Sequence, residues 1–204
     1  MERLLRIWSP FGIIEVTYTI LPWWALAATA SFFWRSKWLD VITVAGALYL
    51  LSAAALMRVA RWWSRHTLGL RRYIAVPIPR WLAVALIRGR MALPAGRRYF
   101  LLHVRVEQGV DLRRMAREMA GDVRRAVESE WARGAVFVGC TFGALGTRQK
   151  RLLEQYGEVV AVPGTFLPAQ TLLLRPKGYQ KKMFGRRWSQ GQWQVVKFQV
   201  NRQG

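Results

Sequence analysis

VITVAGALYLLSAAALM, residues 41–57, is a stretch of the chain without a charged side chain. A helix needs about 17–25 apolar residues to cross the roughly 30 Å hydrocarbon core of a bilayer, and this stretch is long enough. A second apolar stretch precedes it, PFGIIEVTYTILPWWALAATASFFW at residues 10–34, in which Glu15 is the one charged residue. A turn with Arg35 and Lys37 separates the two stretches. Residues 1–60 are therefore predicted to form a transmembrane hairpin of two helices.

Two alternatives to this hairpin are a cleaved signal peptide and a buried helical hairpin of a soluble protein. A signal peptide ends in small residues at its cleavage site, whereas Phe32, Phe33 and Trp34 end the first apolar stretch. Tryptophans also flank both stretches, as expected where the ring is half buried among lipid headgroups. The side chains predicted to lie at the membrane interface are Trp8, Trp34, Trp38, Arg58, Arg61, Trp62, Trp63 and Arg65.

The distribution of basic residues predicts the orientation and the location of the protein. From Arg58 to the C-terminus the chain contains 28 of its 32 Lys and Arg but 8 of its 11 Asp and Glu. A flank so rich in Lys and Arg stays in the cytoplasm, so both termini are predicted to be cytoplasmic, with two spans in a bacterial inner membrane. The excess positive charge also predicts an anionic neighbour, first the headgroups of the bilayer itself, with nucleic acid or a nucleotide as alternatives.

Residues 61–96 are expected to form a basic juxtamembrane linker. Residues 58–72 are expected to continue the second helix, and the segment VPIP at residues 76–79 is expected to interrupt it, because proline has no N–H and pushes the residue before it into an extended conformation. The segment WLAVALIRGRM at residues 81–91 is apolar but too short to span a bilayer. It suits either an interfacial helix or a helix packed on the following domain.

Residues 97–204 have the pattern of a small basic α/β domain. Apolar, β-branched runs predict strands, and apolar residues on one helical face predict helices between them. Strand, helix, strand, helix and strand in this order are typical of a βαβαβ core with a mostly parallel sheet. The predicted strands are residues 99–106, 135–140 and 158–162, the predicted helices are 111–134 and 147–156, and two C-terminal strands are expected at 171–174 and 194–200.

A glycine-rich turn, GCTFGALGT at residues 139–147, lies between a predicted strand and a predicted helix. Backbone N–H groups in such a turn can bind an anion, and the helix N-terminus favours negative charge. The turn has neither of the standard nucleotide-binding glycine patterns, and glycine needed for turn geometry alone is the alternative. The candidate phosphate-binding residues are Gly139, Thr141, Gly143, Gly146, Thr147 and Arg148.

A second candidate is the basic, aromatic stretch RPKGYQKKMFGRRWSQGQW at residues 175–193. Cations and inserted rings suit a lipid surface, whereas cations with stacking rings suit single-stranded nucleic acid. A solvated hairpin without a ligand is the third alternative. The candidate contact residues are Lys177, Lys181, Lys182, Arg186, Arg187, Trp188 and Trp193.

The sequence contains one cysteine, Cys140, and two histidines, and none of them stands at metal-ligand or catalytic spacing. We therefore expect no enzyme, no cofactor and no metal. The leading hypothesis is a membrane-anchored interaction protein, a subunit of an inner-membrane assembly whose partners are other membrane subunits or copies of itself. The alternative is a nucleotide-gated membrane effector, in which the domain binds a phosphate-containing ligand and the hairpins oligomerise to perturb the membrane.

Overall fold

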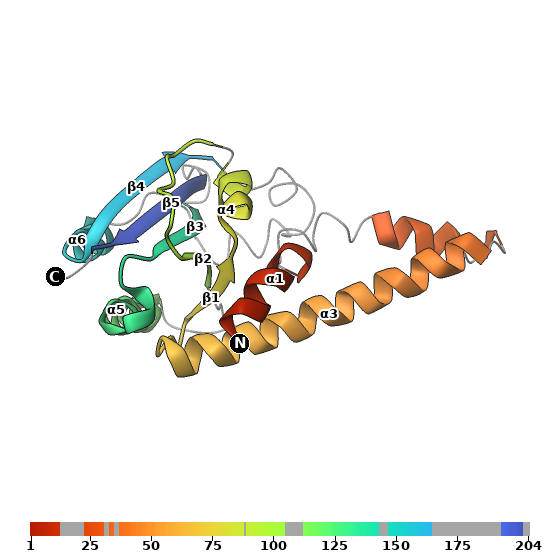
Figure 1. The fold of residues 1–204 in the computed structure, drawn as a ribbon, viewed down its shortest axis with the longest axis horizontal. Helices are drawn as coiled ribbons and strands as arrows, with labels where there is room; N and C mark the ends of the chain where they lie inside the picture. Colours follow the sequence, from red (N-terminus) through yellow and green to blue (C-terminus); the bar gives the residue numbers. More distant parts are fainter. Residues whose placement is uncertain are drawn as a thin grey trace.

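A computed structural model describes residues 1–12, 23–30, 33–34, 37–87, 89–104, 112–142, 147–164 and 193–201. The protein is of mixed α/β class, with a five-stranded sheet at one end and a long apolar helix that extends away from it (Figure 1). In chain order, the elements are α1 (Glu2–Gly12), α3 (Lys37–Thr67), β1 (Tyr73–Ile78), α4 (Arg80–Ile87), β2 (Tyr99–Val104), α5 (Leu112–Glu128), the short 3₁₀ helix η1 (Glu130–Ala132), β3 (Val136–Phe142), α6 (Thr147–Glu154), β4 (Gly157–Pro163) and β5 (Trp193–Val200).

Helix α3 contains the whole apolar stretch of residues 41–57. It has 31 residues and is therefore about 46 Å long at 1.5 Å per residue. In the described part of the chain it is the one helix long and apolar enough to cross a membrane, and 6% of its apolar window is buried. The predicted apolar helix is thus present, and its insertion into a bilayer stays a prediction.

Part of the first apolar stretch lies beside α3. Residues 23–30 are helical and run along the outer part of α3 (Figure 1). The indole Nε1 of Trp24 donates a hydrogen bond of 2.9 Å to the carbonyl of Thr43. A Cβ on Gly46 would lie 1.7 Å from Cδ1 of Trp24, so this ring occupies the space that a side chain there would need. Residues 13–22 lie outside the described ranges, and the complete two-helix hairpin is not confirmed.

The sheet is mixed, with the strand order β1-β2-β3-β5-β4. Strands β2 and β3 are parallel and are connected by α5, as the sequence predicts. However, β5 pairs antiparallel with both β3 and β4 and separates them. The predicted βαβαβ core with a mostly parallel sheet is therefore not the arrangement found. The physical reason is that a strand from the end of the chain takes the position next to β3, a long-range pairing that local sequence patterns do not encode.

The segment expected to be a linker contributes to this sheet. Strand β1 includes Pro77, which lies opposite Phe100 of β2. Because β1 is an edge strand, it tolerates a residue that cannot donate a backbone hydrogen bond. The extended backbone expected before the two prolines is found between α3 and α4, but its pairing with β2 as a strand of the sheet was not predicted. Helix α4 follows directly and packs on the domain through four buried side chains, Leu82, Ala83, Leu86 and Ile87.

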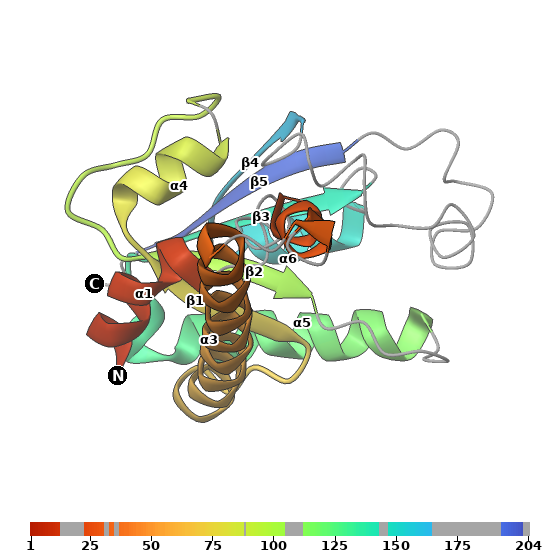
Figure 2. The same cartoon turned by 90° about the vertical axis from the view of Figure 1, so that its right-hand side faces the viewer.

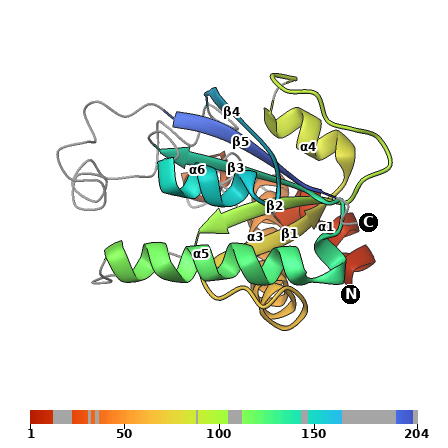
Figure 3. The same cartoon turned by 90° about the vertical axis from the view of Figure 1, so that its left-hand side faces the viewer.

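Helices cover both faces of the sheet. Figure 3 shows α5 and α6 in front of one face, and Figure 2 shows α1, α3 and α4 in front of the other. Stacked aromatic rings cross the middle of the domain, with centroid distances of 5.8 Å from Trp63 to Phe100, 5.2 Å from Phe100 to Phe137 and 6.1 Å from Phe137 to Phe198. The inner end of α3 is therefore part of the same core as the sheet.

Candidate functional site

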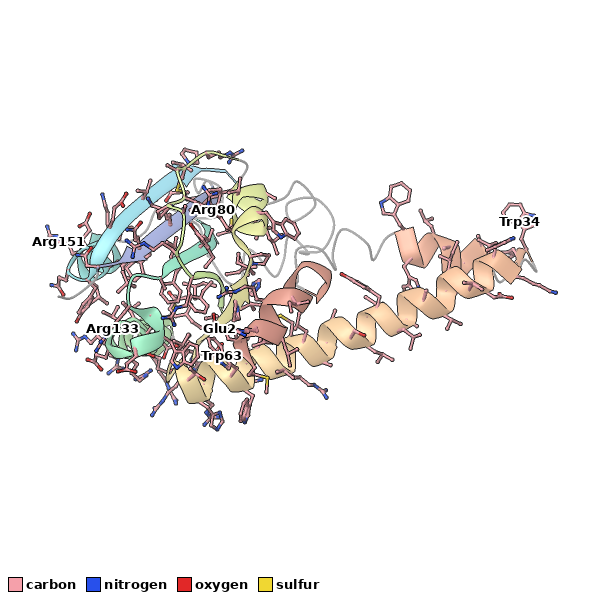
Figure 4. The ribbon with its side chains drawn as sticks, in the orientation of Figure 1. Glu2, Trp34, Trp63, Arg80, Arg133 and Arg151 are labelled. Atoms are coloured by element: carbon pink, nitrogen blue, oxygen red, sulfur yellow. The ribbon has the colours of Figure 1, made fainter. Side chains whose placement is uncertain are left out.

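The last part of α3, residues 58–67, is the first candidate site, and we name it the α3 junction. Its inner face is buried in the domain: Ala60, Trp63 and Ser64 are 0%, 3% and 1% exposed. Figure 4 shows Trp63 where the helix meets the domain. The Oγ atom of Ser64 lies 2.8 Å from the carbonyl oxygen of Ala75 and accepts a 2.9 Å hydrogen bond from its N–H, which joins α3 to β1.

A buried carboxylate fixes the turn that follows the junction, and we name this arrangement the Asp122 clamp. Asp122 of α5 is fully buried and accepts hydrogen bonds from the backbone N–H groups of Arg71, Arg72 and Tyr73, at 3.0, 2.6 and 2.9 Å. The guanidinium of Arg125 pairs with the same carboxylate. The Nε of Arg125 also donates to the carbonyl of Gly69 at 2.7 Å. The clamp thus binds the end of α3 to α5.

A second carboxylate on α5 neutralises a buried cation beside the clamp. Arg72 is 7% exposed and forms an ion pair with Glu118, which also accepts a 3.0 Å hydrogen bond from Arg114. Hydrogen bonds from Arg72 and Arg114 hold the pKa of Glu118 below its ordinary value. Burial of the Tyr73 phenol raises the pKa of that group, and the Asp122 carboxylate adds to the increase. All these groups stabilise the attachment of α3 to the domain.

The lowered pKa of Glu118 predicts an acid-sensitive contribution to stability. Its ionised form is favoured in the folded protein, so the contribution is present above the pKa of the unfolded chain and is lost as the pH falls through the lower, folded-state value. Below a pH of about 5, the free energy of unfolding should therefore fall more steeply for the wild type than for Glu118→Gln. Denaturant unfolding at a series of pH values measures both slopes, and equal slopes would contradict the prediction.

The structure places most of the predicted interface residues on the surface of α3 or just before it. Trp34, Trp38 and Trp62 are 72%, 80% and 54% exposed, and the side chain of Trp8 lies outside the described part. The exposed cations of the α3 junction are Arg58, Arg61 and Arg65.

Trp63 was predicted to lie at the membrane interface, but its side chain is buried in the domain core. Successive residues of a helix point about 100° apart, so Trp62 and Trp63 occupy different faces. The spacing of Ala60, Trp63 and Ser64 marks one helical face, and this signal was available in the sequence.

The second candidate site is a cavity of about 180 Å³ between the sheet and helices α5 and α6. We name it the sheet cavity. Its walls are mainly apolar, and Tyr73, Asp122 and Cys140 are polar or ionisable exceptions. No Lys or Arg is among the described residues that line it. The cavity therefore suits an apolar group and offers no described cation to a phosphate.

The candidate phosphate-binding residues are only partly described. Gly139 is part of β3 and lines the sheet cavity, and Thr141 lies two residues further along the strand. Thr147 and Arg148 are the first residues of α6, whose backbone alone is described there. Gly143 and Gly146 lie outside the described ranges. Phosphate binding by this turn stays a prediction.

The basic, aromatic stretch lies almost entirely outside the described part of the chain. Of its candidate contact residues, Trp193 begins β5, where its backbone pairs with Phe142 of β3. The other six, Lys177, Lys181, Lys182, Arg186, Arg187 and Trp188, fall between the described ends of β4 and β5. Lipid or nucleic-acid binding by this stretch also stays a prediction.

A comparison of the chain with protein-family models, curated proteins and solved structures finds no match.

Proposed function

We propose that this protein is a membrane-anchored, non-enzymatic interaction protein, a subunit of an inner-membrane assembly that holds a basic α/β domain at the cytoplasmic face. The continuity of α3 is the main support. The outer part of this helix is apolar and almost entirely unburied, whereas Ala60 and Trp63 near its inner end belong to the domain core. In this proposal α3 is the second of two spans, and its inner end is cytoplasmic.

The manner of attachment favours an assembly subunit over a loosely tethered domain. A flexible tether raises local concentration but sets no orientation. Here the helix enters the core without a break, and Ser64 and the Asp122 clamp fix the chain on either side of the turn that follows. The domain would therefore present the same surface to its neighbours at all times, as a subunit of a membrane complex requires.

The charges of the α3 junction support the proposed orientation. Arg58, Arg61 and Arg65 are exposed directly after the apolar stretch. Each cation near an anionic membrane surface contributes about 1 kcal/mol of attraction. Between them lies Trp62, stacked on His66 with a centroid distance of 4.7 Å. Anionic lipid is thus the first partner, and other membrane subunits or copies of this chain are the second.

The alternative function, a nucleotide-gated effector, receives no support from the sheet cavity. A phosphate needs positive charge or converging backbone N–H groups, and the described walls of this cavity are mainly apolar. We therefore retain the interaction protein as the proposal.

The rigid attachment can be tested by a six-residue Gly-Ser insertion between Met57 and Arg58. The control is the same insertion after Gly96, an exposed loop residue. Both variants should remain in the membrane fraction. In mild detergent, the wild type and the control should migrate in a complex larger than one chain, and the junction variant should migrate as a monomer. A monomeric wild type in every mild detergent, or an intact complex with the junction insertion, would contradict the proposal.

A further inference from the structure

We infer that α1 and α4 form a second lipid-contacting surface, which lies in the headgroup layer beside α3. We name this surface the collar and define it by the exposed apolar side chains Leu4 and Ile7 of α1 and Trp81 and Val84 of α4. The inference rests on the proposed function, because it requires α3 to be in the membrane. It adds that the folded domain itself is seated in the bilayer surface.

The first argument is the distance between the apolar stretch and the domain core. Arg58 directly follows the apolar stretch, whose last residues Leu56 and Met57 already pack against the core, and Ala60 is completely buried. Two residues of helix rise about 3 Å, whereas the headgroup region is about 5–8 Å thick on each side of the hydrocarbon. The domain therefore begins within the headgroup layer. Helix α1 packs against both α3 and β1 at this end of the domain, so it must contact lipid headgroups.

The second argument is the side of the sheet on which the two helices lie. Helices α1 and α4 are on the same side as the outer part of α3 (Figures 1 and 2), and α5 and α6 are on the opposite side (Figure 3). If α3 crosses the bilayer, α1 and α4 face the membrane and α5 and α6 face the cytoplasm.

The exposed side chains of α1 have the composition of a membrane-facing surface. Leu5 is 2% exposed and packs in the core, whereas its neighbour Leu4 is 58% exposed and Ile7 is 63% exposed. Arg3 is exposed next to them. Apolar side chains with an adjacent cation match the boundary between acyl chains and anionic headgroups.

Helix α4 has the same division between buried and exposed faces, although nearly all its residues are apolar. Its buried face packs on the domain, but Trp81 is 61% exposed and Val84 is 38% exposed on the other side. A helix that is apolar all round is normally covered on every side. Tryptophan favours the membrane interface, where its ring is partly buried and its N–H stays wet. A bilayer surface would cover this face without another protein.

The single cysteine permits a direct test by spin labelling. In a Cys140→Ser background, one cysteine is introduced at Ile7 or Val84 of the collar, at Leu48 of α3, or at Arg151 of α6. Leu48 and Arg151 are both exposed, and Figure 4 shows Arg151 at the end of the molecule remote from the outer part of α3. Each full-length variant is labelled with a nitroxide, reconstituted in nanodiscs with anionic lipid, and measured for collisions with oxygen and with a water-soluble nickel chelate. Near-UV circular dichroism verifies that each variant is folded.

The inference predicts several-fold fewer nickel collisions at positions 7 and 84 than at position 151, together with more oxygen collisions. The label at position 48 should be the most exposed to oxygen. Suppose that the label at position 48 shows the collision rates expected in lipid. If the labels at positions 7 and 84 then collide with oxygen and nickel as often as the label at position 151, the lipid contact of the collar is refuted and the proposed function remains intact. Protection of the labels at positions 7 and 84 from both oxygen and nickel would also refute the lipid contact of the collar. In that case a protein surface, such as a second copy of the chain, would cover these positions. A label at 48 with the collision rates of 151 would instead refute the proposed function.

Discussion

Replacement of Trp63 by alanine is expected to lower the free energy of unfolding by about 3–5 kcal/mol, the range for truncation of a buried large aromatic residue. The Trp63 ring is 3% exposed, stacks on Phe100 and meets the edge of Trp131 at a centroid distance of 6.2 Å. Its loss leaves a cavity where α3 joins the core, so the attachment of the helix to the domain should weaken as well.

The adjacent Trp62 provides a matched control on the same helix. It is 54% exposed, and Trp62→Ala should change stability by roughly 0.5 kcal/mol or less, as for most surface positions. Denaturant unfolding of each full-length variant in detergent, monitored by near-UV circular dichroism, gives its free energy of unfolding. A similar loss of stability for the two variants would contradict the described packing of α3.

Replacement of Asp122 by alanine should have an effect of comparable size, about 3–5 kcal/mol, because a buried charged partner is removed. The backbone N–H groups of Arg71, Arg72 and Tyr73 would lose their common acceptor, and the charge of Arg125 would lose its pair. Asp122→Asn keeps one acceptor oxygen and the shape of the side chain, so its loss should be smaller but clearly measurable.

Glu154 is the matched control for the Asp122 clamp. It pairs with Lys150 at 3.6 Å on the exposed surface of α6, where an ion pair contributes about 0–1 kcal/mol. The same unfolding measurement should therefore find Glu154→Ala close to the wild type. If Asp122→Ala were equally mild, the turn after α3 would be held by contacts other than the clamp.

The sequence predicts the local elements of this fold better than their arrangement. Alternating or continuous apolar runs located β2, β3, β4 and β5 to within about two residues at their described ends. The helix expected at residues 111–134 was too long, since α5 ends at Glu128 and Ser129 caps the short helix η1. The position of β5 between β3 and β4 depends on pairing between segments that are distant in the sequence. Neither the spacing of apolar residues nor the composition of a strand specifies this pairing.

The most important site residues were also difficult to find by local reasoning. Asp122 lies three residues after Met119 and four before Ala126, at the edge of the apolar face of α5, but this spacing does not show which groups its carboxylate binds. Its partners are backbone N–H groups about 50 residues earlier in the chain, and any residue type except proline supplies such a group. Trp63 was different, because its spacing from Ala60 did indicate a buried helical face.

The unbroken helix α3 also has a mechanical consequence. A span that is longer than the local hydrocarbon thickness tilts to match it. Because no joint separates the apolar stretch from the domain core, a tilt of α3 would swing the sheet through the same angle, while insertion of Trp81 and Ile7 would oppose the swing on one side. If α3 crosses the bilayer as proposed, membrane thickness would thus set the height and inclination of α5 and α6 relative to the membrane surface.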